Sequence, residues 1–275
     1  MNKKWILLLV AVLLALPGCA SRAAWEEEEL HETSHRLLAD GVEAEWTVQE
    51  QEPSEAKHPA RIRIALKTAD GTSIERFDLN HEKLLHLIVV SKDLSYFNHI
   101  HPAYVGNGAF EIDNDFPFGG AYRLIADFKP TGGDAMTKMA WVNLRGEAKE
   151  TGPVVPGGTL VDIADGVRAK LTVERLAAKS DSTLSFELLD DGTGEPITDL
   201  EPYLGAIGHV VVLSEDGNRY VHVHAEDGQG AGPKATFEAM FPSAGIYKIW
   251  GQFRRGGRVF TVSYVVDVPR EEPAK

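Results

Sequence analysis

The chain repeats itself, and this internal repeat limits the folds it can adopt more than any other feature. The pattern A-D-G-V-x-A-x-x-T-V at 39–48 recurs at 164–173, and F-P-x-x-G-x-Y at 116–122 recurs at 241–247. Both pairs are 125 residues apart, which indicates duplication of one domain. We therefore predict two copies with a Pro- and Gly-containing linker between them. The predicted boundaries are 37–149 for the first copy, 150–158 for the linker, 159–270 for the second copy and 271–275 for a tail.

Each copy has the pattern of short β-strands. Residues 42–48 and 61–66 alternate polar and apolar side chains with period two, and 84–90 and 258–268 are rich in β-branched and aromatic residues. Turn signals such as Asp216-Gly217 separate these runs. About seven short strands in about 110 residues, with no long amphipathic helix, predict an all-β fold of two tandem immunoglobulin-like antiparallel β-sandwich domains.

Composition excludes several classes of function. The 275 residues, 43% of them hydrophobic, suffice for two packed cores. A formal charge of −13 argues against nucleic acid as a partner, because phosphate binding needs clustered Lys and Arg. The single cysteine excludes an intrachain disulfide and any multi-cysteine metal site. No G-x-S-x-G or G-x-x-x-x-G-K motif occurs, and we expect no enzymatic activity.

The N-terminal segment has the organisation of an export signal. Two lysines precede an apolar run at 5–16 that is too short to span a membrane comfortably. Leu16-Pro17-Gly18-Cys19 resembles the lipobox of bacterial lipoprotein signals. This resemblance implies cleavage of a signal peptide at 1–18, a lipid on the Cys19 sulfur and an acidic tether at 19–36. The protein would then be lipid-anchored in the cell envelope outside the cytoplasm, although an ordinary secretory signal or an N-terminal anchor would also fit.

A zinc-protease motif, His31-Glu32-x-x-His35, lies in this tether. It precedes any domain, in an acidic stretch with no helical subdomain around it. We therefore interpret it as a chance match or an auxiliary metal-binding pair.

The histidines form the most specific pattern. Six of the ten fall in two matched sets with the spacing H-x12-H-x-H. The first set is His86, His99 and His101, and the second is His209, His222 and His224.

Hairpin geometry predicts that the members of each set share one face. A two-residue turn at Asp216-Gly217 makes the numbers of facing residues sum to 433, which puts His209 opposite His224. The same register in the first copy gives a sum of 187 and puts His86 opposite His101. The third histidine of each set lies two residues away along its strand and therefore on the same face.

Three convergent neutral imidazoles suit a borderline divalent ion such as Zn²⁺ or Cu²⁺. Met136, Met139 and Met240 are candidate sulfur ligands, and for this reason we name copper before zinc. The alternative is that the histidines are structural, in a non-catalytic interaction or scaffold protein. Duplication copies structural residues as well, so the matched spacing leaves both interpretations open.

The segments 85–102 and 203–224 resemble YtkA-like, immunoglobulin-type β domains of bacterial exported proteins, a family associated with metal and copper handling. The resemblance implies a β-sandwich without established enzymatic activity. It extends the metal role to the six histidines of the two sets. We accordingly predict a lipoprotein that buffers, delivers or senses a transition metal in partnership with the membrane and with a metal transporter or another envelope protein.

Overall fold

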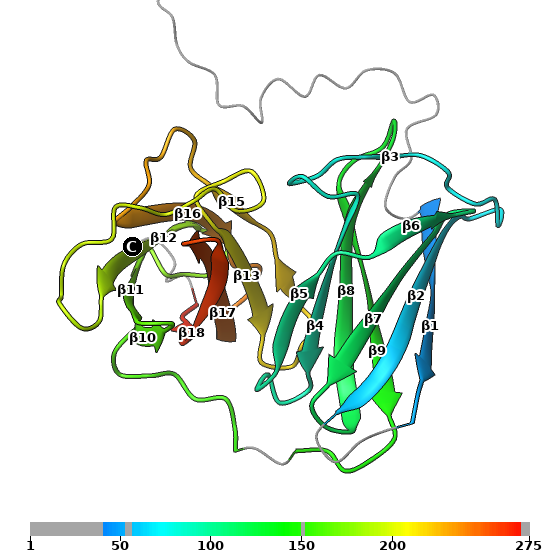
Figure 1. The fold of residues 1–275 in the computed structure, drawn as a ribbon, viewed down its shortest axis with the longest axis horizontal. Coiled ribbons are helices and arrows are strands. Elements are labelled where there is room, and N and C mark those ends of the chain that lie inside the picture. The colour runs from blue at the N-terminus through cyan, green and yellow to red at the C-terminus, as the bar shows by residue number, and fades with distance from the viewer. Residues whose placement is uncertain (1–40, 53–56, 150–151, 271–275) are drawn as a thin grey trace, which may run out of the picture. The chain divides into compact units, whose positions relative to one another are not determined.

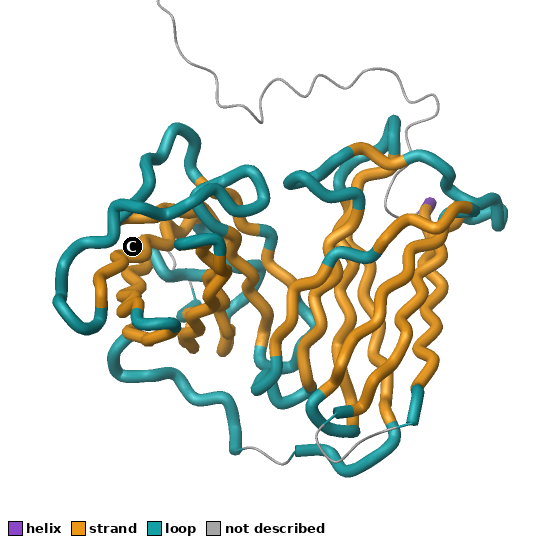
Figure 2. The backbone as a smooth tube through the Cα atoms, viewed as in Figure 1, coloured by secondary structure: helices purple, strands orange, loops and turns teal. Residues whose placement is uncertain are grey.

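The computed structural model describes residues 41–52, 57–149 and 152–270. In this part of the chain the backbone consists of strands and loops, with a single residue of 3₁₀ helix at Gly41 (Figure 2). The all-β prediction is confirmed. The predictions made for Cys19, for the signal peptide and tether, and for the His31–His35 motif lie outside the described residues. Within the described residues, no helix has both the length and the apolar character needed to cross a membrane.

The first repeat is a sandwich of two antiparallel sheets (Figure 1). Its strands are β1 (Val42–Glu50), β2 (His58–Thr68), β3 (Phe77–Asp78), β4 (Leu85–Ser91), β5 (Phe97–Ile100), β6 (Ala103–Gly106), β7 (Ala109–Phe116), β8 (Gly120–Pro130) and β9 (Met136–Leu144). One sheet has the order β1-β2-β7-β6, and the other has the order β3-β8-β4-β5, with β9 also paired to β8.

The second repeat is built in the same way. Its strands are β10 (Val161–Ala164), β11 (Val167–Glu174), β12 (Asp181–Asp190), β13 (His209–Ser214), β14 (Tyr220–Val221), β15 (Val223–Ala225), β16 (Lys234–Met240), β17 (Gly245–Arg255) and β18 (Arg258–Val268). One sheet has the order β10-β11-β12-β16-β15, and the other β14-β13-β17-β18. Apart from the additional β3 and β10, each strand of one repeat has an equivalent in the other, which confirms two tandem sandwiches of immunoglobulin-like build.

Alternation of side chains explains the outer sheet of the first repeat. On β2, Ile62, Ile64 and Leu66 are fully buried in the core of this sandwich. Arg61, directly before Ile62, lies on the other face and makes a two-point ion pair with Asp113 of β7, with N···O distances of 2.8 and 3.0 Å. The period-two pattern in the sequence therefore places the apolar face inward.

The β4 strand behaves differently, because all seven of its residues are buried. Leu87 packs into the core of its own sandwich. Its neighbour Ile88 points the other way, into a third apolar cluster that includes Val211 and Trp250 of the second repeat. The continuous apolar run of β4 thus reflects burial on both faces, and five of the six residues of the equivalent strand β13 are buried as well. His86, two residues before Ile88, lies on the face of β4 turned toward the second repeat.

Contacts between the repeats come in matched pairs. The Lys248 ammonium on β17 donates to the carbonyl oxygen of Leu94, which follows β4, at 2.8 Å. Arg123, the equivalent of Lys248 on β8, lies close enough to Asp216 of the other repeat for the two charges to attract. The ring of Trp250 stacks on that of Phe97, with centroids 4.9 Å apart and planes 16° from parallel. The two sandwiches therefore bury a common apolar interface.

The predicted registers are correct, but the predicted hairpins are shorter than expected. Ile88 pairs with His99 and Val212 with Val221, as the sums of 187 and 433 require. Pairing then stops, because the chain crosses to the opposite sheet, where β6 pairs with β7 and β15 with β16. The predicted pairs of His86 with His101 and of His209 with His224 are consequently absent from the ladders of the described residues.

Candidate metal centre

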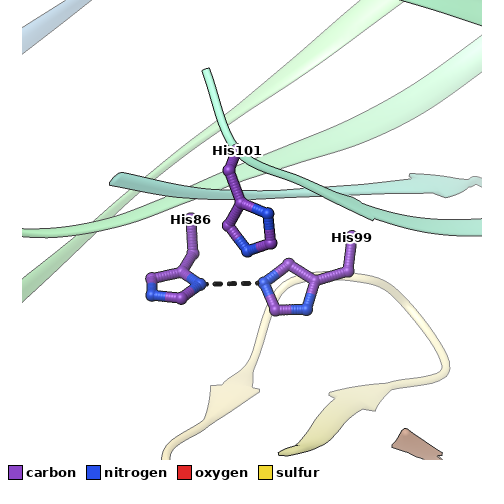
Figure 3. A group of neighbouring side chains, drawn as sticks. All are labelled: His86, His99 and His101. Carbon is purple, nitrogen blue, oxygen red and sulfur yellow. Dashed lines mark hydrogen bonds between the residues drawn. The ribbon is translucent and has the colours of Figure 1, made fainter. Parts of the chain in front are cut away.

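The first histidine set converges on one point. His86 comes from β4 and His99 from β5, while His101 lies just after β5, where the chain leaves its sheet. One ring nitrogen from each residue can be chosen so that all three lie within 4.8 Å of one another. Figure 3 shows the three rings turned toward each other. The shared-face prediction therefore holds for this set, although His101 reaches it from the crossover rather than from the hairpin.

Two of the three rings are held by acceptors behind them. His86 Nε2 lies 2.8 Å from the backbone carbonyl oxygen of Asn80, and His99 Nδ1 lies 2.7 Å from Oε1 of Gln252 on β17. The amide nitrogen of Gln252 in turn donates to Thr261 Oγ1 at 3.3 Å. Carbonyl oxygens only accept hydrogen bonds, so His86 Nε2 and His99 Nδ1 must both carry hydrogen. A metal-binding histidine is fixed by this kind of contact through its other nitrogen.

This arrangement places two lone pairs face to face. With hydrogen on the outer nitrogens, the neutral rings present bare His86 Nδ1 and His99 Nε2, which lie 3.0 Å apart (Figure 3). Neither atom then has a proton to donate to the other. A shared proton would require one of the rings to be a cation. A metal ion bonded to both nitrogens would instead use both lone pairs.

His101 adds a third nitrogen that lacks a partner. Its Nε2 is buried and has no hydrogen bond in the described part of the chain. The His101 ring centroid lies 5.0 Å from that of His86 and 4.9 Å from that of His99. A buried polar atom without a partner is costly, so this nitrogen is also available for coordination.

Burial keeps these imidazoles neutral. It lowers the pKa of His86 to about 4 and that of His101 to about 4, and it holds the pKa of His99 well below its ordinary value. The neighbouring histidines lower these pKa values further, because two adjacent imidazolium ions repel each other. The set therefore presents neutral nitrogen ligands at pH 7, as metal binding requires.

The second set is dispersed by comparison. His209 turns toward the first set, with its ring centroid 4.7 Å from that of His99 and its ring stacked over His86 at 5.7 Å. His222 and His224 remain together, with centroids 4.4 Å apart. Among the described residues, the only metal-sized cluster of three or more His, Cys, Asp or Glu is the first set. Since β14 ends at Val221 and β15 joins another sheet, the two later histidines do not follow His209 across a hairpin.

Sequence reasoning missed three residues of this region. Gln252 and Asp127 occupy equivalent positions on β17 and β8, one residue before the matched Phe253 and Phe128, so the repeat itself could have drawn attention to them. His81 lies in a turn before β4, with its ring 5.8 Å from that of His209. The second repeat has Leu204 at the corresponding position, so no repeat pattern marks His81.

The methionines lie in other surroundings. Met136 is buried in the core of the first sandwich, and Met240 is exposed on β16. Met139 packs against the interface cluster and accepts a contact from the Arg123 guanidinium at 3.8 Å. Sulfur ligation therefore has no support from the placement of these side chains.

The two antiparallel sandwiches share their strand order apart from β3 and β10, and a histidine cluster lies where they meet. These features define a tandem immunoglobulin-like β-sandwich protein. A protein-family model described as "Domain of unknown function (DUF8832)" matches residues 38–146 and again residues 161–270. The chain belongs to this family and carries its domain twice. The resemblance to YtkA-like domains stays a prediction.

Similarity to solved structures is distant. Invasin, a bacterial integrin-binding protein, is 10% identical with a TM-score of 0.24, and the match covers 82% of this chain and 39% of that chain. Domains 4 and 5 of the S-layer protein SbsC are 12% identical with a TM-score of 0.22, over 84% of this chain and 98% of that one. HBP35 of Porphyromonas gingivalis is 10% identical with a TM-score of 0.25, over 82% and 64%. No curated protein sequence matches the chain.

Proposed function

We propose that this protein binds a transition metal ion, copper or zinc, through His86, His99 and His101. Its role is then to buffer, deliver or sense that ion, without catalysing a reaction. The observation that carries the proposal is the contact between His86 Nδ1 and His99 Nε2 at 3.0 Å. The acceptors behind both rings leave these atoms as lone-pair donors, and a cation between them relieves their repulsion.

The separation of the two facing ring nitrogens is close to that of two ligand atoms on one metal ion. With metal–nitrogen bonds of about 2.0–2.1 Å, the nitrogens of a tetrahedral site lie roughly 3.3 Å apart. His86 Nδ1 and His99 Nε2 are already this close, so only His101 has to turn inward. Three imidazoles suit Cu²⁺ and Zn²⁺ alike, and Cu²⁺ generally binds such ligands more tightly. Copper is therefore the first ion to test on the strength of its affinity for imidazoles, since the methionines lie in other surroundings.

The location and partners of the protein are part of the proposal. The pattern Leu16-Pro17-Gly18-Cys19 supports a lipid anchor on Cys19 and a position in the cell envelope outside the cytoplasm. From there the bound ion would be exchanged with a metal transporter or another envelope protein. The acidic charge of −13 supports an attraction to cations and disfavours nucleic acid.

A second candidate is a scaffold whose histidines are structural. The burial of His86, 2% exposed, and of His99, 8% exposed, favours it, because structural histidines are buried and hydrogen-bonded. The two candidates differ in what metal does to the folded protein. A ligand that binds only the folded state raises its melting temperature, whereas structural histidines give no such response.

The test is a titration of the full chain in mild detergent with Cu²⁺ and, separately, Zn²⁺ at pH 7. We expect micromolar or tighter binding and a rise in melting temperature. A His99→Gln/His101→Gln variant should bind at least tenfold more weakly, whereas His58→Ala, on β2 of the opposite sheet, should bind normally. Absence of binding by the wild type, or unchanged affinity in the His99/His101 variant, would refute the proposal.

A further inference from the structure

Two imidazoles of the second repeat remain unexplained by the three-histidine site. His222 lies between β14 and β15, and His224 lies on β15. Their ring centroids are 4.4 Å apart. Both residues are exposed, and the His222 side chain retains 42% of its accessible surface. These two rings therefore face solvent, whereas His86 and His99 are buried.

Asp127, which belongs to the other repeat, approaches the ring of His222. It is on β8, where it pairs with His86 across the ladder, and it is only 6% exposed. Its Oδ2 lies 3.8 Å from His222 Nδ1. Among the described residues, no hydrogen bond reaches its carboxylate, and burial raises its pKa to about 6. A buried carboxylate without donors is costly unless a cation compensates it.

The equivalent position in the second repeat gives the comparison. Gln252 stands where Asp127 stands, and it reaches across to His99 as Asp127 faces His222. A neutral amide thus lies behind a buried imidazole on one side. On the other side a carboxylate lies close to exposed imidazoles, without the short hydrogen bond that Gln252 makes. The pair of Asp127 and His222 thus differs from the pair of Gln252 and His99 in the carboxylate charge, in the exposed imidazole and in the longer distance between the side chains.

We propose that His222, His224 and Asp127, whose ligand atoms do not yet all lie within 4.8 Å of one another, close around a divalent transition metal such as Zn²⁺ to form a second metal site, open to solvent. Two neutral imidazoles and one carboxylate are ligands that Zn²⁺ prefers, and solvent supplies the remaining position. The carboxylate moves from 3.8 Å toward His222 to join the ion, which offsets the charge that is otherwise buried. This site rests on the proposed function for the class of metal, but it uses none of the residues of the first site.

The experiment counts the Zn²⁺ bound by the full chain in mild detergent at pH 7, by chelator competition and by elemental analysis after dialysis. We expect two equivalents for the wild type and one for His222→Ala/His224→Ala, with the affinity of the remaining site unchanged within about twofold. Asp127→Asn should weaken the second equivalent at least tenfold. His58→Ala is the matched control and should bind two equivalents.

The outcomes separate the two proposals. One equivalent in the wild type, lost in the His99→Gln/His101→Gln variant, overturns the second site and leaves the first intact. Two equivalents retained by the His222/His224 variant also overturn the second site. No binding at all overturns both. Because His222 and His224 are exposed, their replacement by Ala leaves the cores unchanged, and a thermal melt of each variant verifies this.

Discussion

Gln252 offers a direct test of how the first site is organised. Its Oε1 accepts from His99 Nδ1 at 2.7 Å, and this contact leaves His99 Nε2 as the ligand atom. Gln252→Glu keeps the size of the side chain but replaces the amide by a carboxylate, which can only accept. The substitution therefore holds His99 in the metal-binding tautomer and adds a negative charge behind it.

The expected gain follows from the distance. Across the 2.7 Å contact, the imidazole ring and a metal bond, the introduced carboxylate lies about 7 Å from the ion. At an effective dielectric constant of about 20, unit charges at about 7 Å interact by about 2.4 kcal/mol, and a divalent ion doubles this figure. Desolvation of the carboxylate removes part of the gain. We expect binding about tenfold to a hundredfold tighter, or about 1.4–2.8 kcal/mol.

The same change should weaken the metal-free protein. Gln252 is only 6% exposed, so the introduced charge is buried without a cation and also leaves Thr261 with a changed partner. A loss of about 1–3 kcal/mol of folding stability follows. The signature is therefore a lower melting temperature without metal and a larger increase on adding it.

Chelator competition gives the affinity, and thermal melts with and without metal give the two stabilities. Gln49→Glu, at an exposed position of β1, introduces the same charge away from the site and serves as the control. If Gln252→Glu remains folded and binds metal with wild-type or lower affinity, the idea that Gln252 orients a metal ligand through its oxygen is wrong.

The buried side chains of His86 and Trp250 both affect the stability of the folded protein. Burial lowers the pKa of His86 from 6.5 to about 4, so the unfolded chain takes up this proton first and stability falls as the pH drops through this range. His86 alone accounts for a loss of about 2 kcal/mol of folding stability between pH 7 and pH 5, and melting temperatures measured without metal should show this decline. Asp127, with its pKa raised to about 6, acts in the opposite direction, because the folded protein takes up its proton first. Asp127→Asn should therefore make the loss of stability with falling pH steeper. Trp250→Ala should cost about 3–5 kcal/mol, because Trp250 is 3% exposed and stacked on Phe97 in the shared cluster. Chemical denaturation should then show two transitions where the wild type shows one, and an unchanged curve would contradict a cooperative interface.

Much of each sandwich could be predicted from the sequence, because local pattern determines it. Alternation along β2 gives its buried face, and the turn after β13 gives the register that pairs Val212 with Val221. The crossing of the chain to the other sheet after Ile100 could not be predicted in this way. The crossing depends on β7, a partner strand that lies further along the chain. No periodic pattern of polar and apolar residues in the crossing segment indicates which sheet it joins.

The sequence predicts which residues form the candidate site better than it predicts how those residues are arranged. The spacing H-x12-H-x-H points to His86 and His99, but it predicts two separate sites, because a repeat pattern contains no information on how the two copies pack together. The fully apolar run of β4 was the signal that its second face is covered. What covers it is the second repeat, and the same packing brings Gln252 to His99. A side chain from so distant a part of the sequence can be assigned only once the interface is known.

The matched contacts between the repeats have a consequence for the origin of the chain. Gln252 of the second repeat reaches His99 of the first, while Asp127 of the first faces His222 of the second. Such reciprocity is the mark of an isologous interface, in which two identical subunits meet about a two-fold axis. This pattern of reciprocal contacts is what results when the two identical subunits of a homodimer, each a single sandwich, become joined in one chain by gene duplication and fusion. Fusion also removes the constraint of identity, so that one half can keep an amide where the other acquires a carboxylate.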